Sequence, residues 1–399
     1  MDDSSSSSEV LDYEEPVTPA GRLFHRPEME QVINCAVGVK NPIADAEAIK
    51  EEIKKSLMIK HPRFRSVLVR DKRGREHWRR LSHVDLDSHV ESVCVIESEP
   101  GQAVVGVPRV AASEVPRAAC PSLLGRWDFV DVFVPGVLEG FGVKDVKTCI
   151  SGGDGVELLP RKLATAKFKL DDLKFVKNAV SNATINDVLF GVISSGLSRY
   201  LDLKSPNELQ EGLEITGLAM VNLRKQPGLQ ELSKLMKDKS SSRWGNKFGF
   251  MMVPVYYHKH ATRDPLEYAS KAKATIDQKK LSLEAHFTYI LGYLAMTLLG
   301  PKVAACLNYR IICNTSFTVS NIFGPQEEIT CAGNPVTYLR AITMHMVSYV
   351  GNAEMQVLAA KDIIPEPKVL AKCFEEALLE MKSAVQSSTD STLKQLPGH

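Results

Sequence analysis

The stretch from Ala183 to Tyr200 constrains the fold of this chain more than any other stretch. Thr184 can cap the start of a helix, and Asp187, three positions later, completes a capping box. Apolar residues then recur at intervals of four, which places an apolar stripe along an α-helix. The stripe consists of Ile185, Leu189, Ile193 and Leu197, with a second one beside it of Val188, Val192 and Gly196. A helix that is apolar on nearly all sides is expected to be buried.

Small side chains form part of the surface of this predicted helix. On a buried helix they permit either the close approach of another backbone or room for a ligand. The simpler interpretation is a core helix, because most apolar periodicity reflects packing. The small residues are Gly191, Ser194, Ser195, Gly196 and Ser198.

The composition is that of a globular protein and argues against several function classes. The chain has 399 residues, of which 44% are hydrophobic and 24% charged, and is long enough for two domains. A net charge of +1 argues against general nucleic-acid binding. The eight cysteines are scattered, without a CxxC pair or zinc-ligand spacing, so we expect reduced thiols in an intracellular chain and no metal site. The acidic N-terminus is neither a secretory signal nor a transit peptide.

Predicted helices and strands alternate along the chain, which indicates a mixed α/β fold in two lobes. We expect a disordered tail at 1–15, an N-terminal lobe at 16–165 and a C-terminal lobe at 166–399. The predicted strands are 31–39, 64–70, 76–80, 215–221, 248–257, 315–321, 336–350 and 354–360, and the predicted helices are 43–58, 170–180, 183–200, a helix capped by Asp264, and 365–385.

Two apolar stretches approach, without reaching, the length of a membrane span, which needs about 20 residues. The stretch 287–300, FTYILGYLAMTLLG, is too short, and we expect a buried or interfacial helix there. The stretch 129–143 is interrupted by Asp131, Pro135 and Glu139.

Seven arginines gather in and around the predicted hairpin of 64–80. The simpler interpretation is a solvated hairpin face. The alternative is a surface for an anionic head group or the phosphates of acyl-CoA. These residues are Arg63, Arg65, Arg70, Arg73, Arg75, Arg79 and Arg80.

The segment 101–127 departs from both helical and strand periodicity. It is rich in Ala, Val, Pro and Arg, and its prolines at 108, 116 and 121 indicate loop or disorder. We therefore expect the N-terminal lobe to be irregular here.

Several further stretches, in this order, resemble the plant-type wax ester synthase/diacylglycerol O-acyltransferase family. They are LFHRPEMEQVINCAVGV (23–39), KHPRFRSVLV (60–69), VDLDSHV (84–90), GGDGVELLPRKL (152–163), TINDVLFGVISSGLSRYL (184–201), AMVNLRKQPGLQEL (219–232), WGNKFGFMMVPV (244–255), DPLEYASKAKATID (264–277) and TVSNIFGPQEEI (318–329). The resemblance covers about residues 17–95 and 128–385.

The resemblance implies the two-lobed CoA-dependent acyltransferase fold, with a tunnel between the lobes. It implies transfer of a fatty acyl group from acyl-CoA, as co-substrate and without a resident cofactor, to a long-chain alcohol or diacylglycerol. It also implies association with the cytosolic face of the endoplasmic reticulum or plasma membrane, and no nucleic-acid partner.

The resemblance also assigns candidate site residues. Asn186 and Asp187 match the family's ND motif, and Ser320 and Asn321 match the SN pair that precedes a Gly-Pro turn. We expect these motifs to pack at the tunnel and at the lobe interface. The full set assigned to the tunnel or to structural motifs is Asn186, Asp187, Gly191, Asn222, Arg224, Ser320 and Asn321.

The family's catalytic signature, HHxxxDG, has no counterpart in this sequence, because none of the ten histidines has a histidine neighbour. The signature's second histidine is expected to deprotonate the acceptor hydroxyl. His83 and His260 each begin an HxxxD pattern, and Asp154 begins a DG pair, but patterns this short arise by chance. Our hypothesis is that 101–127 replaces the catalytic part of the first lobe, by deletion, altered splicing or an error in the gene model.

Two alternatives remain open at this point. The chain is either an acyltransferase of this family or a catalytically inactive relative that binds lipid or a partner through an intact second lobe. A poorly folded product is a third reading, since a lobe that lacks core elements exposes apolar surface.

Overall fold

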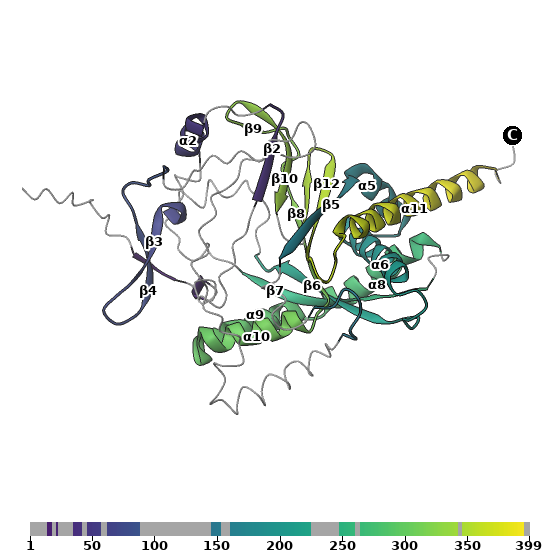
Figure 1. Ribbon diagram of the computed structural model, residues 1–399, viewed down its shortest axis with the longest axis horizontal. Helices are drawn as coiled ribbons and strands as arrows, with labels where there is room; N and C mark the ends of the chain where they lie inside the picture. Colours follow the sequence, from purple (N-terminus) through teal and green to yellow (C-terminus); the bar gives the residue numbers. More distant parts are fainter. Residues whose placement is uncertain are drawn as a thin grey trace, which may run out of the picture.

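A six-stranded mixed sheet forms the centre of the computed structural model (Figure 1). The structure describes residues 14–17, 21–22, 35–41, 46–56, 62–87, 145–152, 160–224, 247–259, 264–341 and 345–394. The strand order in the sheet is β5-β12-β11-β8-β6-β7. The strands are β5 (Arg161–Lys169), β6 (Glu214–Asn222), β7 (Phe248–Tyr256), β8 (Phe317–Phe323), β11 (His345–Tyr349) and β12 (Asn352–Ala360).

Strand β8 runs parallel to both of its neighbours, β6 and β11, and the other pairs of this sheet are antiparallel. The three parallel strands lie in the middle of the sheet, so their carboxyl ends meet at one edge. This edge is where open α/β sheets commonly bind ligands.

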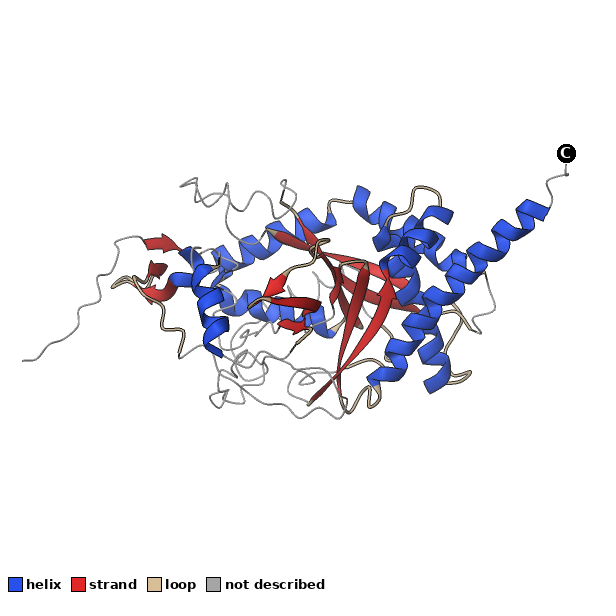
Figure 2. Ribbon diagram, turned by 90° about the horizontal axis from the view of Figure 1, so that it is seen from above, coloured by secondary structure: helices blue, strands red, loops and turns tan. Residues whose placement is uncertain are grey.

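Four helices cover one face of the sheet (Figures 1 and 2). They are α5 (Leu170–Ala179), α6 (Ile185–Lys204), α8 (Pro265–Leu281) and α11 (Pro367–Lys394). Their apolar sides and the inward side chains of the strands form the main hydrophobic core. The mixed α/β fold expected from the sequence is therefore confirmed.

Helix α6 lies at the centre of this core, as its apolar periodicity predicts. The Thr184 side chain accepts a hydrogen bond from the backbone of Asp187, whose carboxylate accepts from the Thr184 backbone, and this completes the predicted capping box. Fourteen residues of the helix are buried, among them all three serines at 194, 195 and 198.

The two glycines of α6 lie against the neighbouring helices α8 and α11. A Cβ built on Gly191 would lie 2.8 Å from the Cα of Ala269 in α8. A Cβ on Gly196 would lie 2.4 Å from the ring of Phe374 in α11. Helix α8 thus occupies the space beside Gly191, as a structural motif would require, and the assignment of Gly191 to a tunnel or a structural motif stays a prediction.

Two smaller sheets come from more distant parts of the sequence. Strand β2 (Cys35–Val39) pairs with β10 (Asn334–Ala341), which also pairs with β9 (Thr330–Cys331). This pairing joins residues 35–39 to residues 334–341, an arrangement that periodicity alone does not reveal.

The predicted basic hairpin is present and lies at the opposite end of the molecule from α11 (Figure 2). Its strands are β3 (Ser66–Arg70) and β4 (Glu76–Arg80), preceded by a 3-10 helix at Pro62–Arg65. Arg70 pairs with Glu76 at 2.9 Å, and Arg75 with Asp71 at 2.7 Å. These ion pairs within the hairpin favour the solvated-face interpretation of the arginines.

The tail predicted at 1–15 extends too far. Strand β1 (Glu14–Pro16) pairs antiparallel with β4, so residues 14 and 15 belong to the hairpin sheet. The lobe boundary predicted between residues 165 and 166 falls inside β5. The irregular segment 101–127 and the apolar stretch 129–143 lie outside the described residues.

Other predicted elements differ from the structure mainly at their ends. The helix expected at 43–58 is described as α2 (Ala46–Lys55), and the closing helix α11 extends nine residues beyond the predicted end. The run 336–350, predicted as one alternating stretch, contains two strands, β10 and β11. They belong to different sheets, so the chain leaves one before entering the other.

The apolar stretch 287–300 is not buried as one helix. It is divided between α9 (Glu284–Leu294) and a π-helical segment (Ala295–Leu299), which α10 (Pro301–Cys313) follows. Helix α9 has no buried residue, and Leu298 is 74% exposed. Within the described part of the chain, no helix is long and apolar enough to cross a membrane.

Substitution of Gly191 by alanine tests the close approach of α6 and α8. Gly292 in α9 is a matched control, because a Cβ there meets no atom within 4 Å. Both substitutions gain similar helix propensity, so the difference between them isolates the packing term. We expect G191A to be less stable than G292A by about 1–3 kcal/mol, measured by urea unfolding. Equal stabilities would contradict the packing described here.

Candidate functional site

Two of the motifs singled out in the sequence meet at the carboxyl edge of the parallel strands. The Nδ2 group of Asn321, near the end of β8, donates a hydrogen bond of 2.8 Å to Oδ1 of Asn186 in the first turn of α6. The two residues are 135 positions apart in sequence, so only the fold brings them together. Both side chains are exposed, which leaves this part of the edge accessible.

Asp187 lies beneath this contact as a fully buried carboxylate. Its Oδ2 atom accepts from the Thr184 backbone at 2.6 Å and from the Thr184 hydroxyl at 2.8 Å, whereas its Oδ1 atom is buried without a partner among the described residues. A carboxylate at a helix N-terminus is favoured by the helix dipole. Asp187 therefore fixes the turn that presents Asn186.

Asn222 is the last residue of β6 and lies beside this edge. Its Oδ1 atom accepts a hydrogen bond of 3.0 Å from the backbone of Arg224, and both side chains are exposed. Strand β6 is parallel to β8, with Ala219 level with Val319, so Asn222 lies at the same end of the sheet as Asn321. The structure thus gathers Asn222 with the two motifs and leaves Gly191 apart, in the middle of α6.

Ser320 and Asn321 point to opposite faces of the sheet, because side chains alternate along a strand. Asn321 faces the helices, as its bond to Asn186 shows. Ser320 faces the side that the four helices do not cover, where its neighbour in register is His345 of β11. The SN motif therefore contributes to both faces, and Ser320 lies on the face opposite the four helices.

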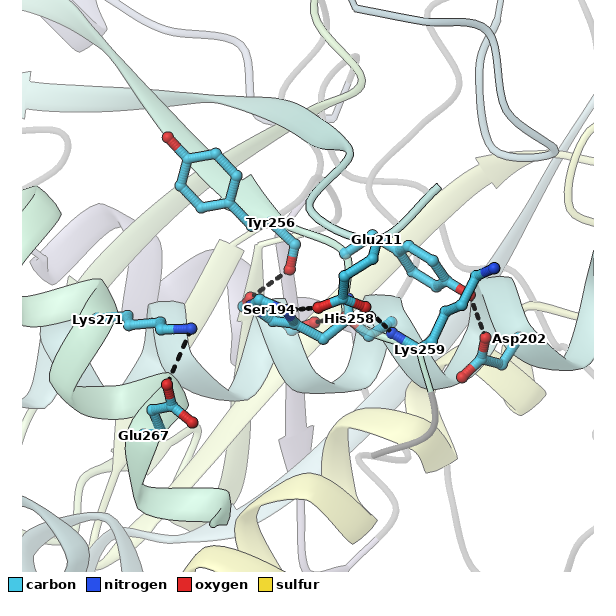
Figure 3. A network of polar contacts seen from close by, with 10 residues as sticks. Ser194, Asp202, Glu211, Tyr256, His258, Lys259, Glu267 and Lys271 are labelled. Carbon is cyan, nitrogen blue, oxygen red and sulfur yellow. Dashed lines mark hydrogen bonds and ion pairs between the residues drawn. The ribbon is translucent and has the colours of Figure 1, made fainter. Parts of the chain in front are cut away.

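A second polar cluster, which the sequence analysis missed, lies on the helix-covered side of the sheet (Figure 3). Nδ1 of His258, just after β7, lies 2.6 Å from Oε1 of Glu211. The backbone N–H of His258 donates to the hydroxyl of Ser198, and its ring packs edge-on against Tyr268. Glu211 is 47 residues away in sequence, so no local pattern signals the pair.

The surroundings of His258 are those of a buried structural network. Tyr257 donates to the carboxylate of Asp202, and burial together with this neighbour raises the pKa of its phenol. Burial also raises the pKa of the Tyr268 phenol. The adjoining pocket is lined in part by Ser194, whose hydroxyl bonds to the backbone of Tyr256. The described residues contain no group of three or more His, Cys, Asp or Glu side chains able to hold a metal ion.

Solved structures with the same architecture identify the fold as that of CoA-dependent acyltransferases. The wax ester synthase/diacylglycerol acyltransferase of Marinobacter aquaeolei VT8 superposes with a TM-score of 0.52 and 14% sequence identity, covering 93% of this chain and 100% of that one. The trichothecene 15-O-acetyltransferase of Fusarium sporotrichioides gives 0.54 and 12%, covering 93% and 95%. At this identity the likeness concerns the fold alone.

Sequence comparison then identifies the family. The model of the WS/DGAT C-terminal domain matches residues 244–382. Wax ester synthase/diacylglycerol acyltransferase 4 of Arabidopsis thaliana is 30% identical over 95% of this chain and 92% of its own length. Wax ester synthase/diacylglycerol acyltransferase 11 of the same plant is 36% identical over 64% of this chain and 55% of its own length. The chain belongs to the wax ester synthase/diacylglycerol acyltransferase family.

The alignments also show that the relatives are longer inside the matched region. The alignment with wax ester synthase/diacylglycerol acyltransferase 5 of Arabidopsis thaliana covers 96% of both chains and extends over 492 positions. This chain has 399 residues, so at least 93 of those positions (492 less 399) have no counterpart in it.

The Asn186–Asn321 contact predicts an energetic coupling between α6 and β8. In a double-mutant cycle with N186A, N321A and the double variant, we expect a coupling of about 0.5–1 kcal/mol in unfolding free energy, typical of one exposed hydrogen bond. A second cycle with N186A and the distant S383A should give a coupling near zero. Equal couplings in the two cycles would show that the Asn pair does not hold these elements together.

Proposed function

We propose that this chain transfers a fatty acyl group from acyl-CoA to the hydroxyl of a long-chain alcohol or of diacylglycerol. The observation that carries the proposal is the match to wax ester synthase/diacylglycerol acyltransferase 4, which extends over nearly the whole length of both chains. The CoA-dependent acyltransferase fold supports it independently. Acyl-CoA takes part as a co-substrate that is consumed, and no resident cofactor is needed.

The chemistry requires a base and a binding site for an apolar chain. The acceptor hydroxyl must lose its proton as its oxygen attacks the thioester carbonyl, and a neutral histidine suits this step at physiological pH. The chain has no adjacent histidine pair to supply this base in the way the family signature does. The first measurement is therefore whether the chain forms product at all.

Transfer of label from palmitoyl-CoA tests the proposal. Microsomes from an expression host are incubated with labelled palmitoyl-CoA and either hexadecanol or diacylglycerol, and lipids are separated by thin-layer chromatography. We expect labelled wax ester or triacylglycerol above an empty-vector control. Acyl-CoA binding to the purified chain without product would instead identify a relative that binds the substrate and does not turn it over.

We further propose that the chain associates with a membrane, at the cytosolic face of the endoplasmic reticulum or the plasma membrane. Its acceptor substrates dissolve in bilayers, and the exposed apolar side chains of α9 and the following π-helical segment provide a surface that can enter one. These residues are Phe287, Ile290, Tyr293, Leu294, Leu298 and Leu299, which are 41–74% exposed. Such a surface supports peripheral binding, since burial of each large apolar side chain contributes about 1.5–3 kcal/mol.

Flotation with phosphatidylcholine vesicles measures this association. We expect L298E to bind about tenfold more weakly than the unchanged protein, because a charge replaces a side chain that enters the apolar layer. L203E is the matched control. Leu203 is also highly exposed, at 64%, but it lies near the C-terminal end of α6 and not in α9 or the π-helical segment. An equal loss in both variants would show that α9 and the π-helical segment do not form the membrane surface.

A further inference from the structure

The exposed side of α9 and α10 carries positive charge without an exposed carboxylate. These helices and the π-helical segment between them span residues 284–313, which contain one carboxylate, that of Glu284. The other charged side chains of this stretch are Lys302 and Arg310, and its histidine, His286, can only add positive charge when it is protonated. Both helices lie along the lower side of the molecule in Figure 1, beneath β6 and β7.

Glu284 is turned toward the sheet, and its side chain is 13% exposed. Its Oε1 atom accepts a hydrogen bond of 2.7 Å from the backbone N–H of Met252 in β7, and its Oε2 atom pairs with Lys279 at 2.8 Å. One turn further along α9, the Thr288 hydroxyl accepts a hydrogen bond of 2.9 Å from the backbone N–H of Phe250. The polar side of α9 therefore faces the edge of β7, and its opposite side is the exposed apolar one.

Lys302 and Arg310 are exposed cations that form no ion pair in the described part of the chain. Ile311 and Ile312, on the inner side of α10, pack against the apolar cluster around Leu218 of β6. With 3.6 residues per turn, Lys302 and Arg310 fall together on the side of α10 that is turned away from these isoleucines. Their charges are therefore presented to whatever lies outside this side of the molecule.

The two cations continue the exposed apolar surface of α9 and the π-helical segment. Leu298 and Leu299, at the turn between the helices, are 74% and 41% exposed, and Lys302 follows three positions after Leu299. In this arrangement apolar side chains can enter a bilayer while lysine and arginine hold their charged ends at the level of the lipid phosphates. The α9–α10 surface is defined here as Lys302 and Arg310 together with the exposed apolar residues of α9 and the π-helical segment named above.

The spacing of the cations fits an extended anionic surface. Arg310 lies eight positions beyond Lys302, which is about 12 Å along the helix axis. Both extend from the outer side of a single helix, so separate lipid head groups meet this geometry better than one small anion does. A bilayer supplies such head groups in the same plane as the acyl layer that the leucines enter.

We propose that the α9–α10 surface binds anionic phospholipids in preference to zwitterionic ones, with Lys302 and Arg310 contacting the lipid phosphates. The inference rests on the proposed membrane association and names the class of lipid that this association selects. A zwitterionic head group balances its phosphate with its own ammonium group, whereas an anionic lipid leaves a net negative charge for the protein to meet. Each lysine or arginine near an anionic leaflet strengthens binding about fivefold.

Flotation with vesicles of two compositions tests the inference. One set contains phosphatidylcholine alone, and the other contains phosphatidylcholine with about 20% phosphatidylserine. We expect the unchanged protein to bind the mixed vesicles about twenty-fivefold more tightly, because two cations contribute. K302Q and R310Q should each lose about fivefold of this preference and the double variant should lose all of it, whereas K302R and R310K, which keep the charge, should retain it.

The matched control removes the same amount of charge elsewhere. Lys361 and Lys368 are exposed lysines without an ion pair in the described residues, and they lie after β12 and at the start of α11. Strand β12 is next to the opposite edge of the sheet from β7. The K361Q/K368Q variant should therefore keep the preference for the mixed vesicles. The preference should also shrink as the salt concentration rises, since salt screens exposed charges.

The outcomes separate this inference from the proposals on which it rests. Equal binding of the unchanged protein to both vesicles would overturn the lipid preference and leave membrane association standing. An equal loss in K302Q/R310Q and K361Q/K368Q would show that net charge, and not the α9–α10 surface, sets the preference, and would overturn the assignment. No flotation with either vesicle would overturn membrane association together with this inference, whereas acyl transfer is measured separately.

Discussion

The packing of α6 between the sheet and the helices α8 and α11 is the constraint on which the described structure depends. Gly191 lets the backbone of α8 approach to a distance that a side chain would forbid, and Gly196 does the same for Phe374. Such contact is possible only if α6 is apolar on nearly all sides. In consequence the four helices all lie on one face of the sheet, whereas Ile311 and Ile312 of α10 pack against Leu218 and Met252 on the other face.

This one-sided arrangement divides the polar groups of the protein between two environments. The His258–Glu211 pair lies on the covered side, within a network that joins the end of β7 to α6 and α8. On the opposite face, Gln356 of β12 is fully buried, and its Nε2 group has no partner among the described residues.

The first turn of α6 connects these two sides of the sheet at the carboxyl edge of the parallel strands. Asn186 and Asn321 hold α6 to β8, and the next residue back along β8, Ser320, faces the other side of the sheet, level with His345 of β11. The family's ND and SN motifs can thus be understood as a single structural link. Its role is to fix the position of β8 relative to α6.

The sequence by itself determined the local elements and the family. The capping box at Thr184, the periodicity of α6 and the hairpin all followed from spacing, because these features depend on neighbours within a few residues. The motifs then identified the family that the comparisons confirmed, and the absence of a histidine pair is likewise visible in the sequence.

Only the tertiary structure decided what each side chain faces. Spacing could not distinguish a tunnel-lining Gly191 from one that admits α8, since both require a small residue. It could not show that α9 is exposed, because burial depends on partners from elsewhere in the chain. It also could not bring together Asn186 and Asn321, which are 135 positions apart in sequence. Long-range strand register decides which residues become neighbours, and no local pattern encodes it.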